Sequence, residues 1–257
     1  MLNDDVELTR RVMVLFLLVD TSGSMDGAKI NTVNDAIANV IPVVRNISAG
    51  NADSLIKIAA MKFDNSVEWI TQKPEEAETF VWHTLPANGM THMGEACRQL
   101  DKKLSTKGEG FMRQATGSFA PVIFMMSDGQ PNDDFDGGLK VLKENKWFKA
   151  AIKVAIAIGD DADHAPLIQF VGSKEGVITV HDPDNLRKWI NFLIVTSSTV
   201  GSKSSNTKSD ADGTPAADNT KQEEMLKAMA GQAQATGAVQ AADGTIDTQV
   251  AATGDVW

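Results

Sequence analysis

The sequence predicts an α/β fold with a doubly wound, mostly parallel central sheet and helices on both of its faces. Three apolar runs, at residues 12–19, 122–126 and 152–158, are interrupted only by Lys153 and lack polar alternation, as strands buried on both faces do. Segments with helical spacing of apolar residues follow these runs, which is the pattern of parallel strands joined by helices. Each run also ends in a polar turn that contains Asp and Gly, and ligands bind at such strand ends in open α/β sheets.

The first half of the chain predicts one long helix, two strands joined by a polar turn, and two further helices. In order, they cover residues 29–47, 55–63 and 67–70, 74–80, and 91–104. The long helix follows from apolar residues such as Ile30, Ile37 and Val44, which lie on one face at a period of 3.6 residues.

The second half predicts a strand, helix, strand, helix, edge strand and closing helix. The expected ranges are 122–126, 139–148, 152–158, 163–170, 176–180 and 184–195. Asp163 is a suitable N-cap for the helix expected at 163–170, and Pro166 falls in the first turn of that helix.

The chain divides into an N-terminal extension at 1–10, a domain at 11–198 and a tail at 199–257. The tail consists mainly of Ser, Thr, Ala, Gly, Asp and Gln, and no aromatic residue occurs between Gly201 and Val256. Such a segment buries too little apolar area to offset its ordering entropy. We therefore expect the tail to be largely disordered, with one short helix at 220–235.

Composition excludes several classes of function. The net charge is −10, which argues against nucleic acid as a partner, because binding it needs a basic face. Cys97 is the only cysteine, so an intramolecular disulfide and a thiolate zinc site are excluded, and a reducing cytoplasm is the expected location. No apolar run reaches the roughly 18–20 residues that span a bilayer, and no signal peptide is recognisable, so we expect no membrane association.

Polar side chains at separate strand ends predict one site for a hard cation. Asp20, Ser22 and Ser24 are spaced by two, so their side chains point the same way in an extended segment. Asp128 follows the second buried run, and Thr91 lies where a loop meets a helix. Carboxylate and hydroxyl oxygens suit Mg²⁺, which takes about six oxygen ligands. Few of these ligands are anionic, so the cation would stay electrophilic and would bind an Asp or Glu of a protein partner.

Three segments resemble the parts of a von Willebrand factor A domain with its metal-ion-dependent adhesion site. They are Asp-Thr-Ser-Gly-Ser-Met at 20–25, Gly-Met-Thr-His-Met-Gly-Glu-Ala at 89–96 and Ser-Asp-Gly-Gln-Pro-Asn-Asp-Asp at 127–134. The resemblance covers residues 10–198 and implies that Mg²⁺ or Mn²⁺ is bound by one set of residues. These are Asp20, Ser22, Ser24, Thr91 and Asp128.

Within that family the third segment is similar to the tellurium-resistance group called TerY. This similarity implies a bacterial or phage stress or defence system, with a protein kinase and a phosphatase as partners. Some members of the group carry a cysteine-rich module at the C-terminus, whereas this chain has a polar tail.

Residues beside the predicted site are candidates for contact with a partner. They are His92, Gln130 and Asp133. Two of them have a simpler alternative: His92 as an exposed loop residue, and Asp133 with its neighbours Asp134 and Asp136 as caps of a helix N-terminus. The long loop at 107–119, with Phe111 among its glycines, is either a partner contact or a packed connection.

Two other functions remain as alternatives to a metal-dependent binding module, which is not an enzyme. A phosphatase of the haloacid-dehalogenase type would use Asp20, Ser127 and the Gly-Asp-Asp at 159–161, but Ser22 occupies the position of its general acid. A scaffold protein with a vestigial metal site would form its complexes without the cation.

Overall fold

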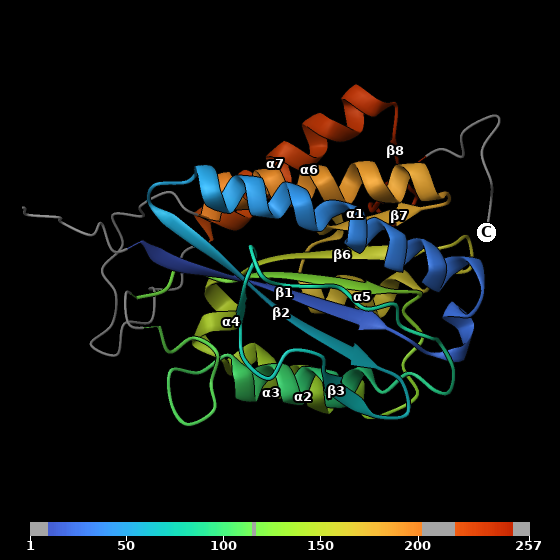
Figure 1. Cartoon of the computed structure of the whole chain (residues 1–257). Helices are drawn as coiled ribbons and strands as arrows, with labels where there is room; N and C mark the ends of the chain where they lie inside the picture. The colour runs from blue at the N-terminus through green and yellow to red at the C-terminus, as the bar shows by residue number, and fades with distance from the viewer. Residues whose placement is uncertain (1–9, 115–116, 202–218, 249–257) are drawn as a thin grey trace, which may run out of the picture.

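The computed structural model describes residues 10–114, 117–201 and 219–248 of the chain. A central sheet runs through the molecule, with helices on both faces (Figure 1). Within the described residues the order is β3-β2-β1-β5-β6-β7-β9-β8, and β4 pairs with β2 beside this path. The strands from β2 to β9 along this path, through β1, β5, β6 and β7, are parallel, whereas β3, β4 and β8 pair antiparallel. The predicted fold class is confirmed.

The strands and helices have the following bounds. The strands are β1 (Arg11–Asp20), β2 (Ser54–Phe63), β3 (Val67–Trp69), β4 (Glu75–Glu76), β5 (Val122–Ser127), β6 (Ile152–Ile158), β7 (Val177–Val180), β8 (Val239–Gln240) and β9 (Ile246–Asp247). The helices are α1 (Ala28–Gly50), α2 (Met93–Lys103), α3 (Phe135–Glu144), α4 (Lys146–Ala150), α5 (His164–Val171), α6 (Pro183–Gly201) and α7 (Thr220–Thr236). Two short 3₁₀ turns are η1 (Gly23–Met25) and η2 (Lys174–Gly176). No helix in the described part of the chain is long and apolar enough to cross a membrane.

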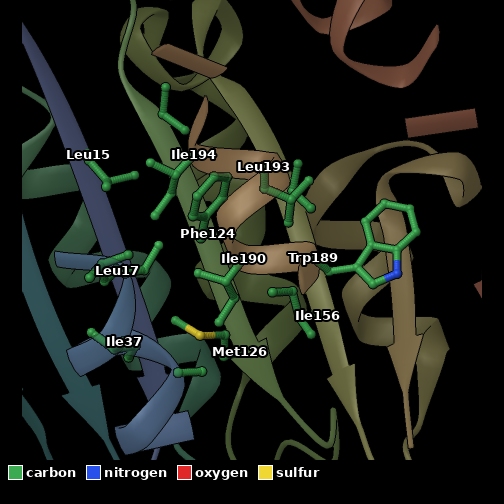
Figure 2. Close-up of a cluster of buried hydrophobic side chains, with 14 of the residues drawn as sticks. Leu15, Leu17, Ile37, Phe124, Met126, Ile156, Trp189, Ile190, Leu193 and Ile194 are labelled. Atoms are coloured by element: carbon green, nitrogen blue, oxygen red, sulfur yellow. The ribbon is translucent and has the colours of Figure 1, made fainter. Parts of the chain in front are cut away.

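Each face of the sheet has its own hydrophobic core, which explains why the central strands are apolar throughout. Leu15 and Leu17 of β1 face the core under α1, α6 and α7, and Figure 2 shows them with Phe124 of β5 and Trp189 of α6. Phe16, between these two leucines, faces the opposite core under α2 to α5. Successive side chains of a strand point to opposite faces, so a strand covered on both sides is apolar at nearly every position, with Lys153 of β6 as an exception.

Three elements differ from the sequence expectation. The closing helix expected at 184–195 extends to Gly201 as α6, past the expected start of the tail at 199. Residues expected to form a helix at 74–80 instead contain β4, which pairs with β2 and satisfies backbone groups at that edge of the sheet. The helix expected at 139–148 starts earlier and breaks at Asn145. The side chain of Asn145 accepts hydrogen bonds from the backbone N–H groups of Trp147 and Phe148, so it caps α4.

Within the region expected to be a largely disordered tail, residues 219–248 form α7 and a β8–β9 hairpin. Helix α7 agrees with the helix expected at 220–235, and its apolar strip buries Met225, Met229 and Ala233. Strand β9 pairs with β7, so β7 is not the edge strand that its sequence predicts. Hydrogen bonds also join α7 to β6, because Gln222 of α7 donates to the backbone oxygen of Lys153 at 3.0 Å and accepts from its N–H at 2.8 Å. Residues 1–9, 202–218 and 249–257, and the expectations that concern them, lie outside the described residues.

Candidate metal centre

The topology places the ends of β1 and β5 side by side. The two strands are parallel neighbours with Val19 opposite Met126, so Asp20 and Ser127 follow at the same edge of the sheet. Asp20 is fully buried and accepts a hydrogen bond from the Ser22 N–H at 2.8 Å. Its other carboxylate oxygen accepts from the Ser127 hydroxyl. Asp20 therefore organises its own loop and joins it to the loop after β5.

Burial raises the pKa of Asp20 to about 6, and the negative charge of Asp128 adds to this rise. The hydrogen bonds from Ser127 and Ser22 oppose it by stabilising the carboxylate. A pKa raised by burial and by a second carboxylate indicates a place where positive charge would be favourable.

Two hydroxyls lie beside Asp20. Ser22 and Ser24 have their Oγ atoms 3.1 Å apart. Ser22 is buried whereas Ser24, in η1, is exposed, so the pair extends from the interior to the surface. The structure thus brings together the three residues that were predicted from their spacing.

Hydrogen bonds from backbone N–H groups attach the loop that carries Thr91 to the loops after β1 and β5. The Gly23 N–H donates to the Gly89 oxygen at 2.9 Å. On the other side, the Thr91 N–H donates to Asn132 Oδ1 at 3.0 Å, and the Asn132 N–H donates to the Thr91 oxygen at 2.9 Å. Gly89 has a φ of 85°, and a Cβ there would lie 2.5 Å from Asn65 Nδ2, so glycine is required. Thr91 itself is 3% exposed.

Asp128 is the least satisfied group of the site. It is 0% exposed, and neither of its carboxylate oxygens has a hydrogen-bond partner within the described structure. Lys29 Nζ lies 3.6 Å from Asp128 Oδ2, within ion-pair range but beyond a hydrogen bond. Lys29 instead donates to Asp161 at 2.6 Å, and this hydrogen bond lowers the pKa of Asp161. A buried carboxylate without donors is costly, which makes Asp128 the position where a cation would be most stabilising.

The donor set fits a hard cation. All five predicted ligands offer oxygen, two as carboxylates and three as hydroxyls, which suits Mg²⁺ or Mn²⁺ better than a thiolate-loving metal. No group of three or more His, Cys, Asp or Glu side chains in the described part of the chain is arranged to hold a metal. A centre built here therefore depends on the serine and threonine hydroxyls.

The three candidate partner-contact residues occupy different positions. Gln130 is exposed and its side chain donates to the Asp161 oxygen at 3.4 Å. His92 is half-buried at the N-terminus of α2. The Asp133 carboxylate accepts from the backbone N–H groups of Gly94 and Glu95, both at 2.8 Å. Asp133 therefore caps α2, where its charge is favourable, and this bonding favours the capping alternative for it.

Sequence reasoning missed three residues that shape the centre. Ser127 is not among the predicted ligands, although it directly precedes Asp128 at the strand end. Asn132 carries no recognisable pattern, because its role is to hold the Thr91 backbone. Lys29 did offer a signal: it lies in the first turn of α1, where a cation opposes the helix dipole and so needs an acidic partner.

Comparisons with known proteins agree with this architecture. The sequence model of the von Willebrand factor type A domain matches residues 15–191. A comparison with curated protein sequences gives no match.

Several solved structures have a similar fold. The pilus adhesin SpaC from Lactobacillus rhamnosus GG, in an open conformation, has a TM-score of 0.57 and 13% identity over 74% of this chain and 30% of its own. A von Willebrand factor type A protein from Catenulispora acidiphila has a TM-score of 0.52 and 15% identity over 73% of this chain and 43% of its own. Proximal thread matrix protein 1 of the mussel byssus has a TM-score of 0.51 and 18% identity over 76% of this chain and 47% of its own. The matched region is thus less than half of each of those chains. Because the family model covers more than half of this sequence, the chain belongs to the von Willebrand factor type A domain family.

Proposed function

We propose that the chain is a metal-dependent protein-binding module. Asp20, Ser22, Ser24, Thr91 and Asp128 would hold Mg²⁺ or Mn²⁺, and the bound cation would supply an electrophilic position for an Asp or Glu side chain of a partner protein. The observation that carries the proposal is the Asp128 carboxylate, which is buried without a hydrogen-bond donor within the described structure. Membership of the family agrees with a role in protein interaction rather than catalysis.

The residues of this chain would perform separate tasks. Asp128 would supply negative charge, and Asp20, hydrogen-bonded by Ser22 and Ser127, would keep the loops after β1 and β5 together. Ser22 and Ser24 would contribute neutral oxygens. A partner would approach from the exposed side, where Ser24 and Gln130 reach the surface.

Calorimetric titration with Mg²⁺ and Mn²⁺ tests the first half of the proposal. We expect binding to the wild type, strong loss in Asp128→Ala, and no change in Asp26→Ala, where Asp26 is an exposed acidic residue two positions after Ser24. Equal metal binding by wild type and Asp128→Ala would contradict the proposed ligand set.

Capture of a partner tests the second half. The tagged protein should retain a partner in Mg²⁺ and release it in EDTA, and Asp20→Ala should fail to capture it while keeping its fold. A partner retained by both the chelated protein and the variant would support a scaffold with a vestigial site instead.

We further propose that the system served by the chain is of the tellurium-resistance TerY type, in the cytoplasm, with a protein kinase and a phosphatase among its partners. The support is the Asp-Gly-Gln-Pro-Asn-Asp-Asp segment at 128–134. Co-purification of such a kinase or phosphatase in Mg²⁺ would support this context, and a captured partner of an unrelated class would contradict it.

A further inference from the structure

A second site lies away from the candidate metal centre, at the other end of α2. Thr91 precedes the first residue of α2, whereas Lys103, its last residue, lines a cavity of about 640 Å³. Strand β3 and the loop that follows α2 supply other walls, through Trp69 and Phe111. The volume falls in the range of small-molecule sites, about 300–1,000 Å³.

The lining of this cavity is mainly positively charged, opposite in sign to the net charge of the chain. Lys57, Lys73, Lys103 and Arg113 converge on it from separate segments, while Glu109 is its one acidic lining residue. The carboxylate of Glu109 lies 3.5 Å from Lys103, and its side chain is 95% exposed. The chain as a whole has a net charge of −10, so this cluster of cations is not a consequence of composition.

Most of these cations lack a carboxylate partner. Among the residues that the structure describes, no ion pair involves Lys57, Lys73 or Arg113. Glu76 is opposite Lys57 in the β2–β4 register, yet these two side chains form no ion pair in that part of the chain. Unpaired cations around one cavity repel one another, and an anion bound between them would remove that repulsion.

An aromatic platform lies beside the cations. Trp69 and Phe111 pack edge-to-face with ring centroids 4.9 Å apart, and Lys103 Nζ lies 4.8 Å from the Phe111 centroid. The indole N–H of Trp69 is buried without an acceptor in the described structure. Gln72 and Gln114 add amide groups to the lining. The combination offers cations for phosphate oxygens, and apolar and amide groups for a base and sugar.

We propose that this cavity binds a nucleoside phosphate. Lys73 and Arg113, which are exposed and come from separate segments of the chain, would bind the phosphate groups. The base and sugar would lie against Trp69 and the glutamine amides. None of the five candidate metal ligands lines the cavity, so this site operates independently of the metal-dependent function proposed above.

Calorimetric titration of the full chain with ADP tests the proposal, with pyrophosphate and adenosine as separate arms. We expect ADP to bind, pyrophosphate to bind more weakly and adenosine not to bind. Lys73→Glu and Arg113→Glu should each weaken ADP binding about 10-fold or more, since each removes a charge-assisted contact. Lys102→Glu is the matched control, because Lys102 is exposed on α2 but does not line the cavity. Asp128→Asn should bind ADP as the wild type does.

Indole fluorescence gives an independent readout. ADP should change the emission of the wild type, and Trp69→Phe should lose that change while it still binds ADP. Absence of ADP binding, or equal affinity in Lys73→Glu, Arg113→Glu and wild type, would overturn the proposal. Binding of a phosphoserine peptide without binding of ADP would also overturn it.

Discussion

Replacing Asp128 by Asn should have opposite effects on stability with and without a divalent cation. Asp128 is 0% exposed, its oxygens accept no hydrogen bond within the described residues, and Asp20 adds a second buried carboxylate nearby. Leaving such a group unsatisfied costs about 1–3 kcal/mol. The ion pair with Lys29 at 3.6 Å recovers part of this cost, so we expect Asp128→Asn to stabilise the metal-free protein by about 1 kcal/mol. For a domain of this size, that corresponds to a rise in Tm of about 2–4 °C.

In Mg²⁺ the wild type should instead be more stable than Asp128→Asn. At a concentration of about 100 times its Kd, a ligand that binds only the folded state stabilises it by about 2.7 kcal/mol. The wild type should gain this stabilisation, and Asp128→Asn should gain little, because it lacks the charged ligand.

Thermal melts followed by circular dichroism, in EDTA and in Mg²⁺, measure both effects. Asp26→Asn is the control, because Asp26 is exposed just beyond Ser24, and it should respond to Mg²⁺ as the wild type does. If Asp128→Asn melts below the wild type in EDTA, Asp128 has a stabilising partner, and the argument from its unsatisfied oxygens is wrong.

Four further outcomes follow from other contacts. Lys29→Gln should tighten Mg²⁺ binding about 10-fold in calorimetry, because it removes a cation 3.6 Å from Asp128. Burial lowers the pKa of Lys153 to about 8. Between about pH 8 and 10.5 the unfolded chain therefore binds more protons than the folded chain, so the folded state becomes more stable as the pH rises. In urea titrations, the free energy of unfolding of the wild type should rise by up to about 3 kcal/mol across that window relative to Lys153→Met. Asp247→Asn should speed amide hydrogen exchange in β9 about five-fold, because it weakens the contact with His181. A Cβ on Gly138 would lie 2.2 Å from a backbone oxygen of α2, so Gly138→Ala should lower the unfolding free energy by about 2 kcal/mol or more in urea.

The central strands could be predicted closely from the sequence because burial on both faces of the sheet produces apolar runs that are visible in the sequence. Strand β6 has the predicted bounds, and β1 and β5 extend the predicted runs by one residue at an end or at both. Each is covered by helices on both faces, so its run is apolar, interrupted only by Lys153 in β6. Strands β4 and β9 contain two residues each and are held by backbone hydrogen bonds to a longer neighbour, which leave little trace in side-chain type.

The candidate site was predictable to the extent that it lies at strand ends. Asp20 follows its apolar run directly and Asp128 follows its run after Ser127, and the structure places both at one edge of the sheet. Ser127 and Asn132 act through contacts between segments far apart in the sequence, with Asp20 and with the Thr91 backbone. Pattern within one segment cannot reveal such contacts.

The loop between β6 and α5 joins the candidate metal centre to the C-terminal hairpin. Consecutive residues of this loop point to different partners: Asp161 accepts from Lys29, the lysine next to Asp128, and Asp160 contacts His181, which also contacts Asp247 of β9. Burial lowers the pKa of His181, but its hydrogen bonds to Asp247 and Asp160 outweigh that effect and raise it, so the imidazolium is favoured between the two carboxylates.

This arrangement couples the charge at Asp128 to the position of one loop. While Asp161 holds Lys29 at 2.6 Å, Lys29 stays 3.6 Å from Asp128 and does not hydrogen-bond to it. A displacement of the loop that breaks the Asp161 contact leaves Asp128 as the nearest carboxylate for Lys29, where the ammonium would compete with a divalent cation. Since the hairpin restrains the same loop through Asp160, loss of the hairpin should weaken cation binding, although no residue of the hairpin is a candidate ligand.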